Sequence, residues 1–208
     1  MTVLVVTLGY DEKFQLRAVS RWFGRDLRKV VIVGSFDDDK AKRALSSLED
    51  YLDKLGVQHE RVEVNPHDMA DIVIKAGRLL ASLAGQDVVV NLSGGMRILI
   101  VGVLAAVLLR EAKVTIEIET EDLAHLATFT SSDLMPVKLT EDHIKVLNAI
   151  REGHTSVNSI HSYLGMPLST TWRKVKDLKD QGLVVEDDSG KLGLTFKAVV
   201  EIALHSFS

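Results

Sequence analysis

The hydrophobic residues in the first two thirds of the chain follow two alternating patterns. Short, continuous β-branched runs are typical of strands buried on both faces of a parallel sheet, and apolar–polar alternation predicts half-buried strands. The segments that predict strands are Val3–Thr7, Val30–Val33, Val57–Val64, Asp87–Val90, Val114–Ile118 and Ala127–Phe129.

Helical periodicity fills the intervals between these strands. The predicted helices are Asp11 to Phe23, Asp37 to Leu55, Asn65 to about Ala84, and Ile98 to Arg110. In the first helix we expect Phe14, Val19 and Phe23 to face the interior. Strands and helices that alternate through short connections imply an open, mostly parallel α/β sheet, in which ligands lie beyond the carboxyl ends of the strands.

The pattern changes after a Ser/Asp/Pro segment at residues 131–136. Beyond it, three helical patterns, a hairpin and a closing helix follow one another in residues 137–208, which is the order of a winged helix-turn-helix. The sequence therefore predicts a domain over 1–130, a linker over 131–136 and a second domain over 137–208.

The third helix of the second domain opens with hydroxyl side chains and continues with cations, which suits base edges and phosphates. The candidate DNA contacts are Ser169, Thr170, Thr171, Arg173, Lys174, Lys176 and Lys179, with Lys191 in the wing. Asp177 and Asp180 lower the net positive charge of this helix. The alternative is therefore a winged helix that binds protein. We expect Trp172 to lie in the core, between the third helix and the first.

Composition narrows the class of protein. The 208 residues are 46% hydrophobic, enough for a substantial core, and the net charge of −4 argues against nucleic-acid binding through overall charge. The chain has no cysteine, which excludes disulfides and thiolate metal sites. Its first residues predict a strand and not a signal peptide, and the apolar run at 98–109 is too short to span a bilayer. We expect a cytoplasmic protein without membrane contact.

The segment Asn-Leu-Ser-Gly-Gly-Met-Arg at 91–97 lies between a predicted strand and a predicted helix. Glycines let a ligand approach the backbone, and the start of a helix offers unpaired N–H groups and a positive dipole end. Ser93 is expected to cap the helix or donate to a phosphate, and Arg97 to bind phosphate oxygens with its guanidinium. The alternative is an ordinary tight turn with a solvated arginine.

Two segments resemble the ligand motifs of the CARF (CRISPR-associated Rossmann fold) domain. They are Val5–Arg17, which contains Thr-Leu-Gly-Tyr, and Leu92–Arg97, which contains Ser-Gly-Gly-Met-Arg. Together with the predicted winged helix, the chain resembles the archaeal CRISPR-associated CARF–winged-helix transcriptional regulators over essentially its whole length.

This resemblance implies a Rossmann-like sheet and a homodimer whose two CARF domains bind one cyclic oligoadenylate, usually the tetra-adenylate, across the two-fold axis. It implies a ligand-responsive regulator that binds DNA at a promoter or CRISPR leader and needs no cofactor. The positions that match the family's ligand motifs, or lie within them, are Thr7, Leu8, Gly9, Tyr10, Phe14, Arg17, Ser93, Gly94, Gly95, Met96 and Arg97.

An enzyme is the alternative. Some CARF domains cleave their ligand with Ser/Thr and Lys beside the phosphates, so a ring nuclease that opens cyclic tetra-adenylate is the second reading, although Met96-Arg97 supplies no lysine. A nucleotide-dependent oxidoreductase would need Gly-x-Gly-x-x-Gly after the first strand, and residues 7–12 lack it. None of the seven histidines has metal-ligand spacing. We therefore expect neither a metal site nor catalytic residues.

Overall fold

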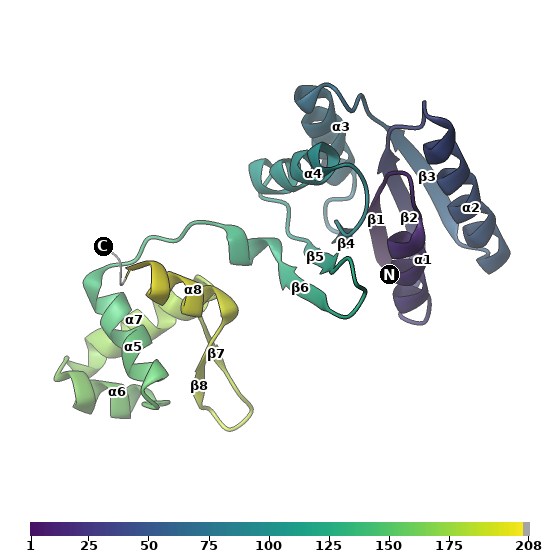
Figure 1. Ribbon diagram of the computed structural model, residues 1–208. Helices are drawn as coiled ribbons and strands as arrows, with labels where there is room; N and C mark the ends of the chain where they lie inside the picture. The colour runs from purple at the N-terminus through teal and green to yellow at the C-terminus, as the bar shows by residue number, and fades with distance from the viewer. Residues whose placement is uncertain (206–208) are drawn as a thin grey trace. The chain divides into compact units, whose positions relative to one another are not determined.

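The computed structural model describes residues 1–205 and divides into two compact units, Met1–Ser131 and Ser132–Ser208. Each unit has its own hydrophobic core, and the helices and strands of both units are labelled in Figure 1. The division falls inside the predicted linker, where residues Ser131–Leu134 form a short 3₁₀ helix. The Ser131 hydroxyl bonds back to Ala112 and Val114, whereas the Ser132 carbonyl accepts a hydrogen bond from Lys197. The two residues therefore belong to different units.

The first unit is an α/β sandwich with a six-stranded sheet, as the alternating patterns predict. Its elements are β1 (Thr2–Leu8), α1 (Lys13–Phe23), β2 (Leu27–Gly34), α2 (Asp39–Leu55), β3 (Gln58–Glu63), α3 (Met69–Ser82), β4 (Asp87–Asn91), α4 (Arg97–Leu109), β5 (Thr115–Glu119) and β6 (Leu126–Thr130). The strand order is β3-β2-β1-β4-β5-β6, and only β6 runs antiparallel to its neighbour. The sheet is therefore mostly parallel and Rossmann-like, with β1 and β4 side by side at its centre.

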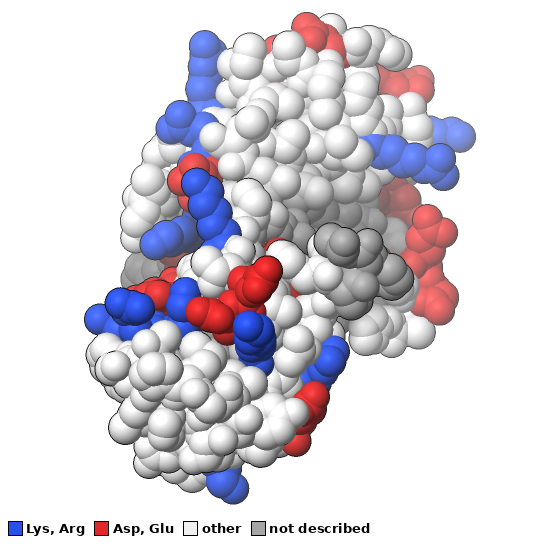
Figure 2. All heavy atoms as spheres, turned by 90° about the vertical axis from the view of Figure 1, so that its left-hand side faces the viewer, with Lys and Arg blue, Asp and Glu red and all other residues white. Residues whose placement is uncertain are grey.

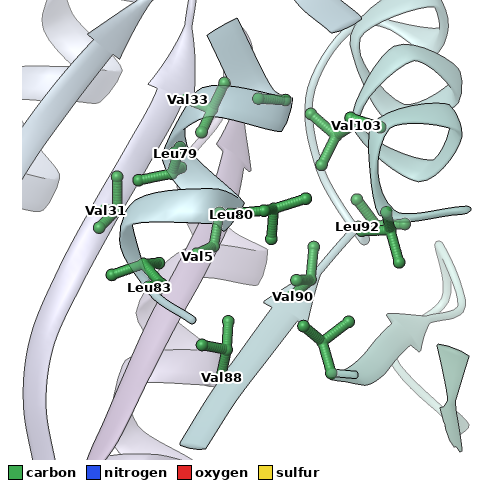
Figure 3. Close-up of a cluster of buried hydrophobic side chains, with 14 of the residues drawn as sticks. Val5, Val31, Val33, Leu79, Leu80, Leu83, Val88, Val90, Leu92 and Val103 are labelled. Atoms are coloured by element: carbon green, nitrogen blue, oxygen red, sulfur yellow. The ribbon is translucent and has the colours of Figure 1, made fainter. Parts of the chain in front are cut away.

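Two helical layers cover the sheet. Helices α1 and α2 pack on one face, over Leu4, Val6 and Ile32. Helices α3 and α4 pack on the other face. There Leu79 and Leu80 of α3, Leu83 directly after α3, and Val103 of α4 lie over side chains of β1, β2 and β4 (Figure 3). Every residue of β1 is buried, because both of its faces are covered.

Helix ends follow the local sequence. The Asp38 side chain accepts a hydrogen bond from the Lys40 amide at the start of α2, and Gly56 ends that helix in the left-handed conformation at φ +67°. One expectation is wrong: Phe23 is half exposed, because α1 ends there and its last turn passes the edge of the core.

Helices α3 and α4 approach each other closely at Gly102. A Cβ atom built on Gly102 would lie 2.5 Å from Ile72 Cγ2 on α3. Real Cβ atoms do not come this near another carbon, so the glycine sets the distance between the two helices.

The second unit contains α5 (Glu141–Arg151), α6 (Val157–Leu164), α7 (Leu168–Asp180), β7 (Val184–Glu186), β8 (Leu192–Leu194) and α8 (Phe196–His205). Strands β7 and β8 form an antiparallel hairpin. Capping boxes begin α5 at Thr140 and α6 at Ser156. The core is formed by α5, α6, α7, the hairpin and α8, and includes Leu147, Ile160 and Leu178.

Among residues 1–205, no helix combines the length and the apolar character that crossing a bilayer requires.

Replacing Gly102 with valine is expected to destabilise the first unit by about 1–3 kcal/mol, because the added carbons must push α3 away from α4. Urea unfolding followed by circular dichroism measures the change. The control is Gly24→Ala, since a Cβ at Gly24 meets nothing within 4 Å and its φ of −77° suits alanine. We expect the control to stay within about 0.5 kcal/mol of the wild type. An unchanged stability of Gly102→Val would contradict the close packing.

Candidate functional site

The candidate site lies at the carboxyl ends of β1 and β4. These strands are neighbours in parallel register, with Val6 opposite Asn91. Helix α1 follows β1 on one face of the sheet and α4 follows β4 on the other, so the connections diverge at this point. Such a divergence leaves a crevice between two helix N-termini, which attracts anions.

Glycine backbones from the two connections touch across the crevice. A Cβ atom on Gly9 would lie 2.9 Å from the Gly95 Cα atom. Gly95 has a φ of +108°, which side chains of L-residues rarely allow, and a Cβ on Gly94 would collide with the Gln15 side chain. Gly9 and Gly95 are therefore required by the backbone geometry, and Gly94 leaves room for the Gln15 side chain.

Two buried side chains hold this arrangement. The Thr7 hydroxyl donates to the Gly94 carbonyl, which joins the end of β1 to the turn after β4. The amide of Gln15, on the first turn of α1, donates to the Thr7 carbonyl. Gln15 is fully buried, and its Oε1 atom has no partner within residues 1–205. The sequence pattern does not predict this role for Gln15, because a polar residue on an amphipathic helix usually lies on the surface.

Ser93 is directed differently from the prediction. Its hydroxyl accepts a hydrogen bond from the Glu119 amide at the end of β5, at 2.8 Å, and no side chain caps α4, which starts after Met96. The expected cap is therefore wrong. Asn91, fully buried, accepts from the Ser93 amide and donates to the Glu117 carboxylate at 3.2 Å. Ser93 and Asn91 therefore connect the glycine turn to β5 by hydrogen bonds.

An ion cluster lies beneath α1, next to this turn. Glu117 and Glu119 both face α1 and are only 3% and 5% exposed. Trp22 Nε1 and Arg21 bond to Glu117 at 2.9 and 3.1 Å, while Arg17 and Arg21 pair with Glu119 at 2.6 and 3.4 Å. The predicted ligand residue Arg17 therefore already has an acidic partner. The signal for this cluster is the alternation Thr-Ile-Glu-Ile-Glu in β5, which places both glutamates on one face.

The cluster changes the acidity of Glu119. Burial alone would raise the pKa of this carboxyl, but the hydrogen bond from Arg17 and the positive charges of Arg21 and Arg17 outweigh it. The net effect is a pKa below the ordinary value of a glutamate, so the carboxylate is ionised wherever the unit is folded near neutral pH.

The predicted ligand residues separate into two groups. Thr7, Leu8, Phe14 and Gly94 are buried in the unit and shape the crevice. Met96 is half-buried, and the exposed side chains are those of Tyr10, Arg17 and Arg97. Arg97 is the first residue of α4 and has no ion-pair partner in the described part of the chain. Its guanidinium is free to meet an anion at the helix N-terminus.

A pocket of about 650 Å³ lies along the outer side of α1 and not over the glycine turn. Its lining includes Arg17, Arg21, Tyr51, Glu119 and His125. Arg17 and Arg21 in this pocket are paired with Glu119 and Glu117, so the pocket lacks the unpaired positive charge that Arg97 supplies.

The predicted DNA contacts lie on α7 and the hairpin. Ser169, Arg173 and Lys176 are exposed on α7, and Lys191 is exposed beside β8. Thr170 is half-buried, Lys174 donates to the Thr140 hydroxyl at 3.1 Å, and Lys179 pairs with Glu186. Arg173, Lys176 and Lys191 therefore have the least restrained cationic groups of the predicted set.

Two expectations for α7 are wrong. Thr171 is fully buried and its hydroxyl bonds to the Pro167 carbonyl at 3.1 Å, so it faces the core instead of a base edge. Trp172 is 57% exposed, with Lys176 over its ring at 5.6 Å. The helix is rotated so that Thr171, Val175 and Leu178 face the interior, at the spacing of one helical face.

Within the described residues, no group of three or more His, Asp or Glu side chains is placed to hold a metal ion.

Comparison with known proteins identifies the first unit. Residues 2–130 match the family described as the Csa3 CRISPR-associated Rossmann-like domain. No curated protein matches the sequence.

Solved structures are similar to this chain at low sequence identity. Can2 from Sulfobacillus thermosulfidooxidans, solved in complex with cyclic tetra-adenylate, is similar over 97% of this chain and 63% of its own, with 11% identity and a TM-score of 0.51. VC1899 from Vibrio cholerae is similar over 97% of this chain and 64% of its own, with 12% identity and a TM-score of 0.47. Csm6 from Enterococcus italicus, solved with a cyclic hexanucleotide analogue, covers 86% of this chain and 55% of its own, with 8% identity and a TM-score of 0.47. The chain spans less than two thirds of the length of these proteins.

The ion cluster predicts a pH dependence of stability. Because the pKa of Glu119 is lower in the folded than in the unfolded state, its ionised form stabilises the fold above the unfolded value of about 4.3. This contribution is lost as the pH falls through the folded-state pKa. Urea unfolding at a series of pH values below 5 is expected to show a shallower decline for Glu119→Gln than for the wild type. Glu121→Gln, at an exposed position in the next loop, should decline as the wild type does. Parallel curves for Glu119→Gln and the wild type would contradict the assignment.

Proposed function

This chain belongs to the Csa3 family through its CRISPR-associated Rossmann-like domain, and from that premise we propose that it is a ligand-responsive DNA-binding regulator of a CRISPR system. The ligand is a cyclic oligoadenylate, and we propose the tetra-adenylate. The observation that carries the proposal is the glycine crevice at β1 and β4, which combines a helix N-terminus with the unpaired Arg97 inside this family's domain. The fold shared with Can2, which was solved with cyclic tetra-adenylate, supports the choice of ligand class.

The site is best completed by a second copy of the chain. A cyclic tetranucleotide of four identical units has a two-fold axis, so two identical glycine turns related by that axis can contact it equally. Each Arg97 then meets a phosphate at the start of α4, where the helix dipole adds to the guanidinium charge. We therefore propose a homodimer with one ligand at the axis.

The second unit is the proposed output. Helices α5, α6 and α7 followed by the β7–β8 hairpin have the order of a winged helix-turn-helix, with α7 as the recognition helix. Ser169, Arg173 and Lys176 lie on its exposed face, and Lys191 lies on the wing. These are groups that contact base edges and phosphates. Ligand binding changes DNA affinity to the extent that it prefers one dimer geometry over another.

The competing function is that of a ring nuclease, and the glycine turn supplies only some of the groups that this activity requires. The Ser93 hydroxyl is held by β5, because it accepts a hydrogen bond from the Glu119 amide, and the motif carries Arg97 where a lysine would be wanted. Incubation with labelled cyclic tetra-adenylate distinguishes the two functions, because a regulator returns the ring intact. Recovery of linear product at a steady turnover would overturn the regulator proposal.

Arg97→Ala is expected to weaken binding of cyclic tetra-adenylate by about a hundredfold or more. The reason is that a dimer loses two charge-assisted contacts, each worth roughly 1.5–3 kcal/mol. Isothermal titration calorimetry measures the affinity. The matched control is Arg28→Ala, an exposed arginine on β2, which should bind as the wild type does. Wild-type affinity in Arg97→Ala would exclude this crevice as the site.

The same Arg97→Ala protein should bind DNA normally without ligand but lose the ligand's effect on DNA affinity. Coupling between sites is typically about 1–3 kcal/mol, so for the wild type we expect a change of roughly five- to 150-fold. Fluorescence anisotropy with a DNA duplex, with and without cyclic tetra-adenylate, measures it.

Arg173→Ala and Lys176→Ala are each expected to weaken binding to a mixed-sequence DNA duplex and to lower the salt dependence by about one unit per monomer, because one phosphate contact is lost. The affinity is measured over a series of salt concentrations. Lys145→Ala on α5, an exposed lysine paired with Asp142, serves as the control. Unchanged salt dependence in both α7 variants would show that α7 is not the DNA-binding helix.

A further inference from the structure

Helix α7 exposes two large apolar side chains near its N-terminus. Leu168, the first residue of the helix, is 48% exposed, and Trp172, one turn later, is 57% exposed. Residues four apart on a helix are neighbours on one face, so the two side chains form one apolar surface. The opposite face of α7 already packs in the core of the second unit. The fold therefore gives no reason for these two positions to be apolar.

Cations border this apolar surface. Arg173 and Lys176 are both exposed, and they follow Trp172 at one and four positions along the helix. Figure 2, viewed from the left-hand side of Figure 1, on which α6 and α7 lie within the second unit, shows broad areas without charged residues and separate groups of Lys and Arg. An apolar protein partner would bury these cations without partners, which is costly, whereas DNA meets them with phosphates. The charges therefore favour duplex DNA as the occupant.

The two aspartates of α7 lie outside this surface. Asp177 is turned toward His143 of α5, with 3.7 Å between its Oδ2 atom and the imidazole Nε2 atom. Asp180 lies eight residues after Trp172, which is about 12 Å along the helix. Neither carboxylate opposes a phosphate at the N-terminal half of α7.

The hydroxyl side chains of α7 supply little base reading of their own. Thr171 is fully buried and Thr170 is half-buried, which leaves Ser169 as the exposed hydroxyl of the first turn. A serine hydroxyl both donates and accepts, so it discriminates poorly between base edges. In a recognition helix the N-terminal residues contact the base edges, and in α7 these include Leu168 and Trp172. Apolar contact is therefore the main source of discrimination at this end of the helix.

The apolar contact has one specific target in the major groove. Thymine presents its C5 methyl group there, and it is the base with an apolar group at this edge. Intercalation between base pairs fits Trp172 less well, because a wedge needs both ring faces and the ammonium of Lys176 lies over one of them, 5.6 Å from the ring centroid. The ring is instead held in place to meet a methyl group within the groove.

We propose that Trp172, with Leu168 beside it, gives the DNA-binding unit its sequence preference, and that the base it selects is thymine, recognised through the C5 methyl group. Arg173 and Lys176 hold the helix on the flanking phosphates. This inference rests on the proposed DNA-binding function and adds the base that the helix prefers. Removing one methyl group from DNA changes neither charge nor hydrogen bonding, so the preference is tested separately from DNA binding itself.

The first test removes the methyl group from the DNA. The wild-type chain selects its preferred duplex from a random-sequence pool, with and without cyclic tetra-adenylate, and each thymine of that duplex is then replaced in turn by deoxyuridine. At a thymine that meets Trp172 we expect binding to weaken about fourfold, which is the effect of leaving one methyl group unburied. Fluorescence anisotropy measures the affinities.

The second test removes the indole ring. Trp172→Ala is expected to weaken binding to the selected duplex by about tenfold or more, because a large apolar contact is lost, and to bind the thymine and deoxyuridine duplexes equally. Its salt dependence should stay that of the wild type, since the cations still meet phosphates. Arg173→Ala should weaken both duplexes and keep the preference for thymine. The matched control is Phe196→Ala on α8, an aromatic side chain 63% exposed in the same unit, which should bind as the wild type does.

The outcomes separate the preference from the binding. A thymine preference that disappears in Trp172→Ala and survives in Arg173→Ala and Phe196→Ala supports the proposal. Equal wild-type binding of thymine and deoxyuridine duplexes, or an unchanged preference in Trp172→Ala, overturns it, leaves DNA binding standing and assigns the apolar surface to a protein partner. A wild type that binds no duplex under either condition overturns the proposed function, and this inference with it.

Discussion

The contact between the backbones of Gly9 and Gly95 is the constraint on which the architecture of the site depends. At 2.9 Å from a would-be Cβ to the neighbouring Cα, the contact leaves room for nothing larger than hydrogen. Thr7 and Gln15 maintain it with hydrogen bonds that are withdrawn from solvent. The ends of β1 and β4 are thereby fixed against each other, and the N-terminus of α4, with Arg97, is presented at a defined place.

The order of elements in the first unit was predictable because its strands are short β-branched runs and its helices repeat at 3.6 residues. The glycine turn was predictable for the same kind of reason, because Ser-Gly-Gly between a predicted strand and a predicted helix indicates a tight connection. The spacing of hydrophobic residues indicates which residues share a face of a helix or strand. The need for glycine at a position such as Gly95 depends on the conformation of the local backbone. Both kinds of information are present in a short window of sequence.

The residues whose positions were predicted wrongly, or were not predicted, depend on contacts between distant segments. Glu117 and Glu119 are as polar as any surface pair, and only the arrival of Arg17, Arg21 and Trp22 from α1 makes their burial possible. Trp172 and Thr171 exchange their expected places because a hydrophobic side chain does not by itself show which way its helix is rotated. Ser93 likewise finds its partner in β5, 26 residues later in the sequence.

The ion cluster between α1 and β5 also affects how the unit responds to heat. The helical layers are otherwise held to the sheet mainly by apolar contacts, whose stabilisation per unit area levels off as the temperature rises. The hydration of carboxylates and guanidinium groups becomes less favourable on heating, so the cost of keeping Glu117, Glu119 and Arg21 away from water falls. The seam between α1 and β5 is therefore the part of the sandwich whose cohesion increases with temperature.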